Sequence, residues 1–193
     1  MPHPKRTPTR PILVHDALTQ AVARQPFIAA LHDHARSSQR TGNVFCLLLA
    51  DVDRLRSIND ARGVAAGDEV LADLADRLRE VIKQPAWHRS EYTLARYDGG
   101  AFMILARPCA LHHGEMLAEA LRFGVAEAPL AQRINATVSI SVAQHRIGEG
   151  IEELLARTER ALHVAKQFGR DRVEVSPTPP SHVERAKVVG LFD

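Results

Sequence analysis

A continuous apolar run most constrains how this chain can fold. It reads Val44-Phe45-Cys46-Leu47-Leu48-Leu49-Ala50 and follows the turn-forming residues Thr41-Gly42-Asn43. A strand that is apolar at consecutive positions is buried on both faces, so the run predicts a central strand covered by helices on both sides. Because spanning a bilayer takes about 18 or more apolar residues, the run also predicts no membrane-spanning segment.

The segments around this strand predict an α/β fold, an α+β sandwich. Apolar residues from Thr19 onward have helical spacing, and the break at Pro26 predicts two short helices. Asp98-Gly99-Gly100-Ala101 is a hairpin signal, so the strands on either side of it should be antiparallel. The remaining expected segments are a helix capped by Asp68 and ending near Lys83, strands at 92–97 and 102–106, a helix at 111–124, a strand at 136–143, a helix at 151–168 ended by Gly169, and a strand at 172–175. Together they predict a mixed central sheet of about five strands flanked by helices.

The two ends of the chain differ in composition from its middle. Four prolines among the first 11 residues predict a flexible Pro-rich arm over residues 1–12. Pro177, Pro179 and Pro180 begin a Pro-rich tail over residues 176–193, which leaves residues 13–175 as the folded domain. The tail ends in an apolar patch at 188–192, for which we expect docking on its own domain or on a partner.

Composition excludes several classes of function. The 25 basic and 23 acidic side chains give a net charge of +2. This charge is too small to produce the positive field of a protein that binds the phosphate backbone of nucleic acid. Cys46 and Cys109 lack the spacing of a zinc site or a disulfide framework. The N-terminus has basic residues but no apolar segment after them, so it is no secretory signal, and we expect a cytoplasmic protein.

Asp51-Val52-Asp53 comes directly after the apolar run. Two carboxylates and a main-chain carbonyl at the rim of a sheet suit Mg²⁺, which takes oxygen ligands and keeps phosphates as further ligands. Taken alone, the pair also fits solvated charges at a strand end.

The wider sequence context resembles the GGDEF family of diguanylate cyclases. The stretch from Asp51 to Asp60, with Gly63 and Gly67-Asp68, matches that family's DxDxFKxxNDxxGHxxGD pattern gap for gap. The resemblance covers about residues 13 to 175. Its other parts are Asp16-Ala17-Leu18-Thr19, like the family's DxLT entry; 136–142, like its TvSiGva strand; and 161–173, like its ALyxAKxxGrNxV close.

The resemblance implies a fold like that of nucleotidyl cyclases and polymerase palms. In that family, two GTP molecules are condensed into cyclic di-GMP across a homodimer, with two divalent ions at each reacting centre. The metal ligands implied here are the Asp51 carboxylate and the Val52 main chain. Asn59 and Asp68 would bind guanine. Lys166 and Arg170 would bind phosphates, and Arg56 keeps a cation where the family has lysine.

The signature loop departs from the family. Where the family has Arg-Tyr-Gly-Gly-(Asp/Glu)-Glu-Phe, this chain reads Arg96-Tyr97-Asp98-Gly99-Gly100-Ala101-Phe102. Gly100 stands at the position of the carboxylate that binds both metals, and Ala101 at the position of the following Glu. Such an electrostatic contribution is typically worth several kcal/mol, about a thousandfold or more in rate. We therefore expect no cyclase activity, and we interpret Asp98 as a turn residue; the alternative is that Asp98 replaces the lost ligand after a loop shift.

The family's inhibitory cyclic di-GMP site also departs from its pattern. Its RxxD motif reads Arg89-Ser90-Glu91-Tyr92 here, with the arginine kept and Tyr92 in place of the aspartate. Glu91 is one residue out of register, which directs its carboxylate to the other face of a strand. We do not expect cyclic di-GMP binding there.

The sequence thus predicts a catalytically inactive regulator in bacterial cyclic di-GMP signalling. Its expected partners are GTP, another signalling protein, or a second GGDEF domain in a homodimer or heterodimer, with Mg²⁺ present only if GTP is bound. One alternative is an active diguanylate cyclase with an unusual loop. The other is an interaction module whose nucleotide-binding residues have lost their role.

Overall fold

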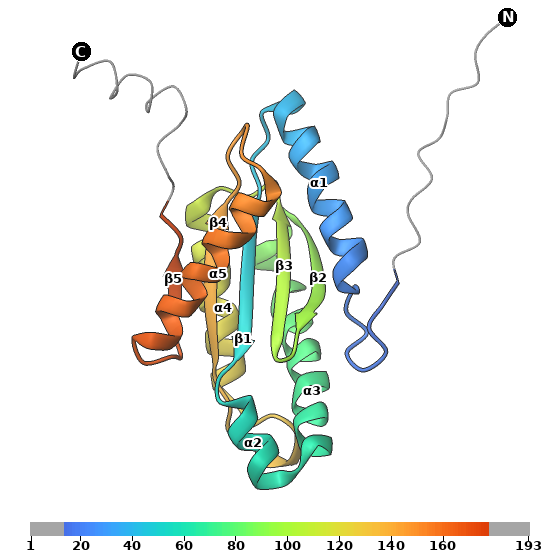
Figure 1. Cartoon of the computed structure of the whole chain (residues 1–193), viewed down its shortest axis with the longest axis vertical. Coiled ribbons are helices and arrows are strands. Elements are labelled where there is room, and N and C mark those ends of the chain that lie inside the picture. Colours follow the sequence, from blue (N-terminus) through green and yellow to red (C-terminus); the bar gives the residue numbers. More distant parts are fainter. Residues whose placement is uncertain (1–13, 178–193) are drawn as a thin grey trace, which may run out of the picture.

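The computed structural model describes residues 14–177, which form one mixed sheet with helices on both faces (Figure 1). The strands lie in the order β2-β3-β1-β4-β5; the β4–β5 pair is parallel and the other pairs are antiparallel. In chain order the elements are α1 (Arg24–Thr41), β1 (Cys46–Val52), α2 (Leu55–Arg62), α3 (Val64–Ile82), the 3-10 helix η1 (Pro85–Trp87), β2 (Glu91–Asp98), β3 (Ala101–Arg107), α4 (Leu111–Ala126), the 3-10 helix η2 (Ala131–Arg133), β4 (Val138–Gln144), α5 (Ile151–Gln167) and β5 (Val173–Val175). The predicted mixed sheet of five strands is confirmed.

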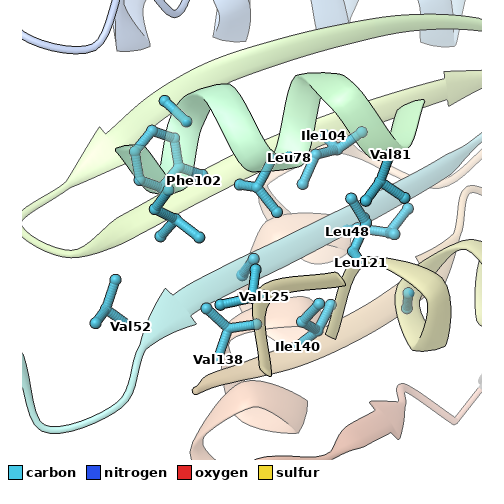
Figure 2. Packing of buried hydrophobic residues seen from close by; sticks show 14 of the residues in the cluster. Leu48, Val52, Leu78, Val81, Phe102, Ile104, Leu121, Val125, Val138 and Ile140 are labelled. Carbon is cyan, nitrogen blue, oxygen red and sulfur yellow. The ribbon is translucent and has the colours of Figure 1, made fainter. Parts of the chain in front are cut away.

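Strand β1 is the centre of the sheet, as its apolar sequence predicts. Leu48 belongs to the core on the face covered by α3 and α4, and Leu47 belongs to the core on the face covered by α1 and α5. Figure 2 shows the first of these cores, in which Leu48 lies among side chains of both covering helices, such as Leu78 and Leu121. The two-sided burial explains why β1 carries no polar residue before Asp51.

Two predicted helix boundaries are wrong, and one helix was missed. The expected break at Pro26 is absent, because α1 is a single helix that starts at Arg24. Pro26 therefore lies in the first turn, where a backbone N–H has no partner within the helix and its loss costs no hydrogen bond. The expected cap Asp68 lies inside α3, which starts at Val64 directly after Gly63. Helix α2 was not expected at all, because its eight residues bury no side chain fully and only Leu55 and Ile58 pack against the core, which is too short an apolar pattern to indicate a helix.

The β2–β3 hairpin sits at the end of β1 that leads into α2. Its loop residues are Gly99, with φ of 45°, and Gly100, whose carbonyl accepts a hydrogen bond of 3.2 Å from the Val52 N–H. In Figure 1, α2 lies beyond this same end of the sheet. The predicted antiparallel hairpin is confirmed, and the fold brings it against the residues that follow the apolar run.

The predicted arm at residues 1–12 lies outside the described residues, as does the tail beyond Pro177. Within residues 14–177, none of the helices is long and apolar enough to cross a membrane.

Candidate functional site

The centre of the candidate site is an ion pair between Asp51 and Lys166. Asp51 is the next-to-last residue of β1, and Lys166 is in the last turn of α5. Lys166 Nζ lies 2.9 Å from Asp51 Oδ2, and the two side chains are 32% and 20% exposed. The carboxylate that the sequence assigns to metal binding is therefore already neutralised by a cation of the protein.

Gly100 approaches the other oxygen of the same carboxylate. A Cβ atom built on Gly100 would lie 3.5 Å from Asp51 Oδ1 and 3.1 Å from Leu55 Cδ2. An acidic residue at position 100 would thus stand beside Asp51, as the family pattern implies. In this chain the place has no side chain, and Ala101, the next residue, is buried in the core.

Asp53, the second carboxylate of the Asp51-Val52-Asp53 motif, is a structural group. It is only 6% exposed and accepts hydrogen bonds from Thr137 Oγ1 (2.6 Å), Ser139 Oγ (2.7 Å) and the Asp171 N–H (3.0 Å). These bonds fasten the β1–α2 connection to β4 and to the loop after α5. Because its oxygens are occupied and buried, Asp53 is not available to a metal ion.

The residues present do not fit a resident magnesium ion. Mg²⁺ needs oxygen ligands in near-octahedral arrangement, usually with one or two free carboxylates. Within residues 14–177 no group of three or more His, Cys, Asp or Glu side chains is arranged to hold a metal. Asp51 is paired with Lys166, so the donor set reduces to one neutralised carboxylate and the Val52 main chain.

Asn59 and Asp68 come together where α2 packs on α3. Asn59 Oδ1 would be only 1.8 Å from a Cβ on Gly67, so glycine at that position is what lets the amide reach the α3 backbone. The same Oδ1 atom is buried and has no hydrogen-bond partner. Asp68 follows Gly67 and is exposed. The two predicted guanine ligands therefore share one location, and one of them carries an unsatisfied polar atom, which native structures rarely leave without a purpose.

The other predicted phosphate ligands do not join Lys166. The Arg56 side chain is 94% exposed and lies 3.9 Å from Asp60, one turn further along α2. Arg170 is exposed beyond the end of α5, with a left-handed φ of 66°. It lines a separate cavity together with residues of α2.

The residues at the predicted degenerate inhibitory site line a cavity of about 680 Å³. Arg89 and Tyr92 share it with Trp87, and burial raises the pKa of the Tyr92 hydroxyl. Glu91 instead pairs with Arg107 at 2.9 Å. The Glu91 carboxylate, one residue out of register with the family motif, thus forms an ion pair with an arginine of the neighbouring strand β3.

The family model for the diguanylate cyclase GGDEF domain matches residues 13–172. The chain belongs to the GGDEF family. Diguanylate cyclase DgcM of Escherichia coli is 35% identical to this GGDEF domain over 159 residues, which are 82% of this chain and 37% of that protein. Cyclic di-GMP phosphodiesterase NbdA of Pseudomonas aeruginosa is 29% identical over 164 residues, 83% of this chain and 20% of that protein. The chain therefore spans well under half the length of these relatives.

Solved GGDEF structures share the fold. DgcB of Caulobacter crescentus, in complex with cyclic di-GMP, superimposes with a TM-score of 0.75 at 27% identity, covering 83% of this chain and 84% of that one. Diguanylate cyclase SiaD of Pseudomonas aeruginosa, in complex with its activator SiaC, gives a TM-score of 0.76 at 27% identity, covering 83% and 61%. This GGDEF domain therefore belongs to a family of cyclic di-GMP signalling proteins.

Proposed function

We propose that this GGDEF domain is a catalytically inactive regulator in cyclic di-GMP signalling, and that it binds GTP. The observation that carries the proposal is the pairing of Asp51 with Lys166 at 2.9 Å beside a glycine at position 100. Two-metal phosphoryl transfer needs carboxylates that hold the ions against the phosphates. A single carboxylate, neutralised by lysine, does not supply that charge.

Nucleotide binding is supported at the guanine end. The buried Asn59 Oδ1 lacks a partner and lies against Gly67, and the exposed Asp68 is the residue that follows Gly67. An aspartate there accepts hydrogen bonds from the ring N–H and amino group of guanine, which adenine does not offer in that arrangement. The proposal therefore includes a preference for GTP over ATP.

Phosphate binding is supported at the start of α2 and the end of α5. Arg54, the N-cap residue of α2, makes no side-chain capping bond, and the first turn holds no acidic residue. The free N–H groups of such a turn favour an anion. Lys166 adds a cation, while Mg²⁺ in this proposal accompanies the triphosphate and is not held by the protein's own carboxylates.

The regulatory part of the proposal is association with another signalling protein or with a second GGDEF domain. SiaD was crystallised with an activator protein, and a segment similar to this chain occurs in the phosphodiesterase NbdA. The family thus occurs in proteins of opposite activity and in a protein complex. An inactive domain would act through such contacts.

The test is calorimetric titration of the full chain with GTP, ATP and cyclic di-GMP, in magnesium and in EDTA, with chromatography of the GTP sample. We expect GTP to bind with micromolar affinity in both buffers and ATP to bind more weakly. We expect chromatography of the GTP sample to show no cyclic di-GMP product. Asp68→Asn should weaken GTP binding about tenfold or more, because a hydrogen bond to a charged group is lost. Asp73→Asn, the same change further along α3, is the matched control and should leave the affinity unchanged.

Each other outcome selects a different function. Formation of cyclic di-GMP would establish the alternative, an active diguanylate cyclase with an unusual loop. Binding of cyclic di-GMP without GTP would make the domain an effector of the second messenger. The absence of binding to all three nucleotides would leave protein association as its only role.

A further inference from the structure

The cavity of about 680 Å³ lies beside the start of α4, on the face of the sheet that α3 and α4 cover. Its lining comes from the turn before β1, residues 86–92, the loop 108–110, and His113 and Met116 of α4. Most of these side chains are apolar or aromatic, and none is Asp or Glu. None of the residues to which we assign guanine or phosphate lines the cavity, so its occupant is independent of nucleotide binding.

Several apolar residues that line this cavity are exposed to solvent. Met116 is 47% exposed, and Ala86, Pro108 and Ala110 are exposed as well. Methionine adapts its shape to irregular apolar partners, and exposed apolar patches with a polar rim are typical of interaction surfaces. Arg89 is exposed in the same lining, and no carboxylate of residues 14–177 forms an ion pair with it. The cavity therefore offers an apolar surface with one unpaired cation.

The last strand of the sheet ends near the same turns of α4. Strand β5 is an edge strand (Figure 1), and its last residue, Val175, pairs with Val142 of β4. Val142 lies under α4, since a Cβ atom built on Gly114 would be 3.1 Å from Val142 Cγ1. Gly114 directly follows His113, which lines the cavity. The chain beyond Pro177 therefore starts about one helix diameter, about 10 Å, from the cavity.

Residues 188–193 have the chemistry that this cavity requires. They read Val188-Val189-Gly190-Leu191-Phe192-Asp193, an apolar segment followed by one acid. Residues 178–187 connect this segment to the end of the described structure and can reach about 30 Å when extended, which is more than the width of α4. A connection of this length gives the segment a local concentration of about 1 mM, so weak contacts suffice to keep it bound.

We infer that this cavity holds the chain's own C-terminal segment, residues 188–193. The apolar side chains of the segment lie against Met116, and the Asp193 carboxylate lies beside Arg89. The segment thus occupies the place that the family pattern assigns to an inhibitory ligand, where Tyr92 replaces the aspartate. As long as the segment is docked, the exposed apolar lining is withdrawn from contact with other proteins.

The first test uses Trp87, the only tryptophan of the chain, which lines the cavity. The tail variant is the full chain with Leu191→Ser and Phe192→Ser. Its matched control carries Ile147→Ser and Phe168→Ser, two exposed apolar residues that do not line the cavity. We expect acrylamide to quench Trp87 fluorescence about twofold more strongly in the tail variant, because the docked segment no longer shields the indole ring. The control should match the unmodified protein, and circular dichroism verifies that both variants are folded.

The second test titrates a synthetic peptide of residues 184–193 into the tail variant, followed by Trp87 fluorescence. We expect a dissociation constant of about 1 mM or tighter, and at least about tenfold weaker binding when Met116→Asp is added. Phe123→Asp is the matched control, because Phe123 is an exposed apolar residue of α4 that does not line the cavity. Asp193→Asn in the peptide should weaken binding about two- to fivefold, and this loss should disappear in the presence of Arg89→Gln.

Three results would overturn the inference: unchanged quenching in the tail variant, no peptide binding at about 5 mM, or equal effects of Met116→Asp and Phe123→Asp. A loss from Asp193→Asn that persists with Arg89→Gln would contradict the charge contact. Dilution of the unmodified protein identifies whose segment is bound. Quenching that does not change with protein concentration assigns the segment to its own domain, whereas quenching that rises on dilution assigns it to a second copy and contradicts docking within one chain.

Discussion

Lys166 Nζ lies 2.9 Å from Asp51 Oδ2, while a Cβ atom built on Gly100 of the signature loop would lie 3.5 Å from the other carboxylate oxygen, Oδ1. A lysine ammonium therefore stands against the carboxylate to which the family pattern assigns a metal ion. The pair is partly exposed, so its own contribution to stability is small, about 1 kcal/mol or less. The ion pair instead affects nucleotide binding, because Asp51 and an incoming phosphate compete for Lys166.

Asp51→Asn should raise the affinity for GTP in EDTA by about three- to tenfold, or about 0.7–1.4 kcal/mol. The substitution releases Lys166 and removes a negative charge that repels phosphate. A site that uses Asp51 to hold Mg²⁺ would instead lose GTP affinity when the same titration is made in magnesium. Calorimetric titration of the variant and of Asp73→Asn provides the comparison, and a loss of GTP affinity confined to Asp51→Asn would contradict our account of the site.

Gly100→Asp should create divalent-cation binding. The new carboxylate would stand beside Asp51, and the only tight neighbour is the end of the flexible Leu55 side chain, at 3.1 Å. Titration with Mn²⁺, followed by electron paramagnetic resonance, should show at least tenfold tighter binding than in the unmodified protein. Ala86→Asp adds the same charge at an exposed position and serves as control. Equal Mn²⁺ binding in both variants would mean that position 100 is not part of a metal site. Ala101→Glu is a poorer test because it would bury a carboxylate in the core.

Gly67→Ala should destabilise the domain although it removes a glycine from a helix. A helix interior normally gains about 1 kcal/mol from this change. Here the new Cβ would meet Asn59 Oδ1 at 1.8 Å, so a loss of about 1–3 kcal/mol is expected. In an Asn59→Ala background the clash is gone and the same substitution should stabilise. Urea unfolding of the unmodified protein, the two single variants and the double variant gives the coupling energy between positions 59 and 67. Additive effects would show that Asn59 does not pack on Gly67.

Arg157→Met should cost about 3–5 kcal/mol of unfolding free energy. Arg157 and Glu149 form a buried pair, with side chains 5% and 4% exposed and Arg157 Nε 2.6 Å from Glu149 Oε1. Arg157 also donates to the Gln144 carbonyl and to Ser176 Oγ. Removing the cation leaves a buried carboxylate unpaired, so the double change with Glu149→Leu should cost less than Arg157→Met alone. Arg160→Met, on the exposed side of α5, should change urea stability by less than about 0.5 kcal/mol.

Stability should fall as the pH is lowered below about 6.5, the ordinary pKa of histidine. Burial, opposed by the Glu149 carbonyl and carboxylate and assisted by the Arg157 cation, lowers the pKa of His145 in the folded state. Its ring stacks on Phe45 at 4.5 Å, and its Nδ1 atom is buried without a partner for a second proton. The unfolded chain therefore binds the proton more readily, so this contribution is complete above the unfolded pKa and is lost as the pH falls toward the folded one.

The measurement for this prediction is the melting temperature between pH 7.5 and pH 5, a range of about one unit or more on each side of the ordinary histidine pKa. His145→Gln should flatten the pH dependence, whatever its effect on stability at neutral pH. His163→Gln, on the exposed surface of α5, is the control and should keep the slope of the unmodified protein. Equal slopes in the two variants would assign the pH dependence to other groups. One such group is His34, whose pKa is also lowered by burial, with a further contribution from the Arg107 charge.

Local pattern in the sequence was sufficient for the architecture. The apolar run gave a central strand because consecutive apolar residues require cover on both faces, and Asp98-Gly99-Gly100 gave the hairpin because glycine accepts the backbone angles of a tight turn. Local pattern failed at Pro26 and at α2. A proline in a first helical turn and a short exposed helix are both decided by neighbours that periodicity does not reveal.

The sequence by itself determined which residues carry the family motif, and where that motif lacks its acids. Only the tertiary structure decided what the remaining charges do. It paired Asp51 with Lys166, buried Asp53 against Thr137 and Asp171, and gathered Arg62 and Arg133 at one cavity. The physical reason is that a carboxylate becomes a metal ligand, an ion-pair partner or a structural acceptor according to the groups within about 4 Å of it. Those groups come from segments far apart along the chain, and only the folded sheet brings them together.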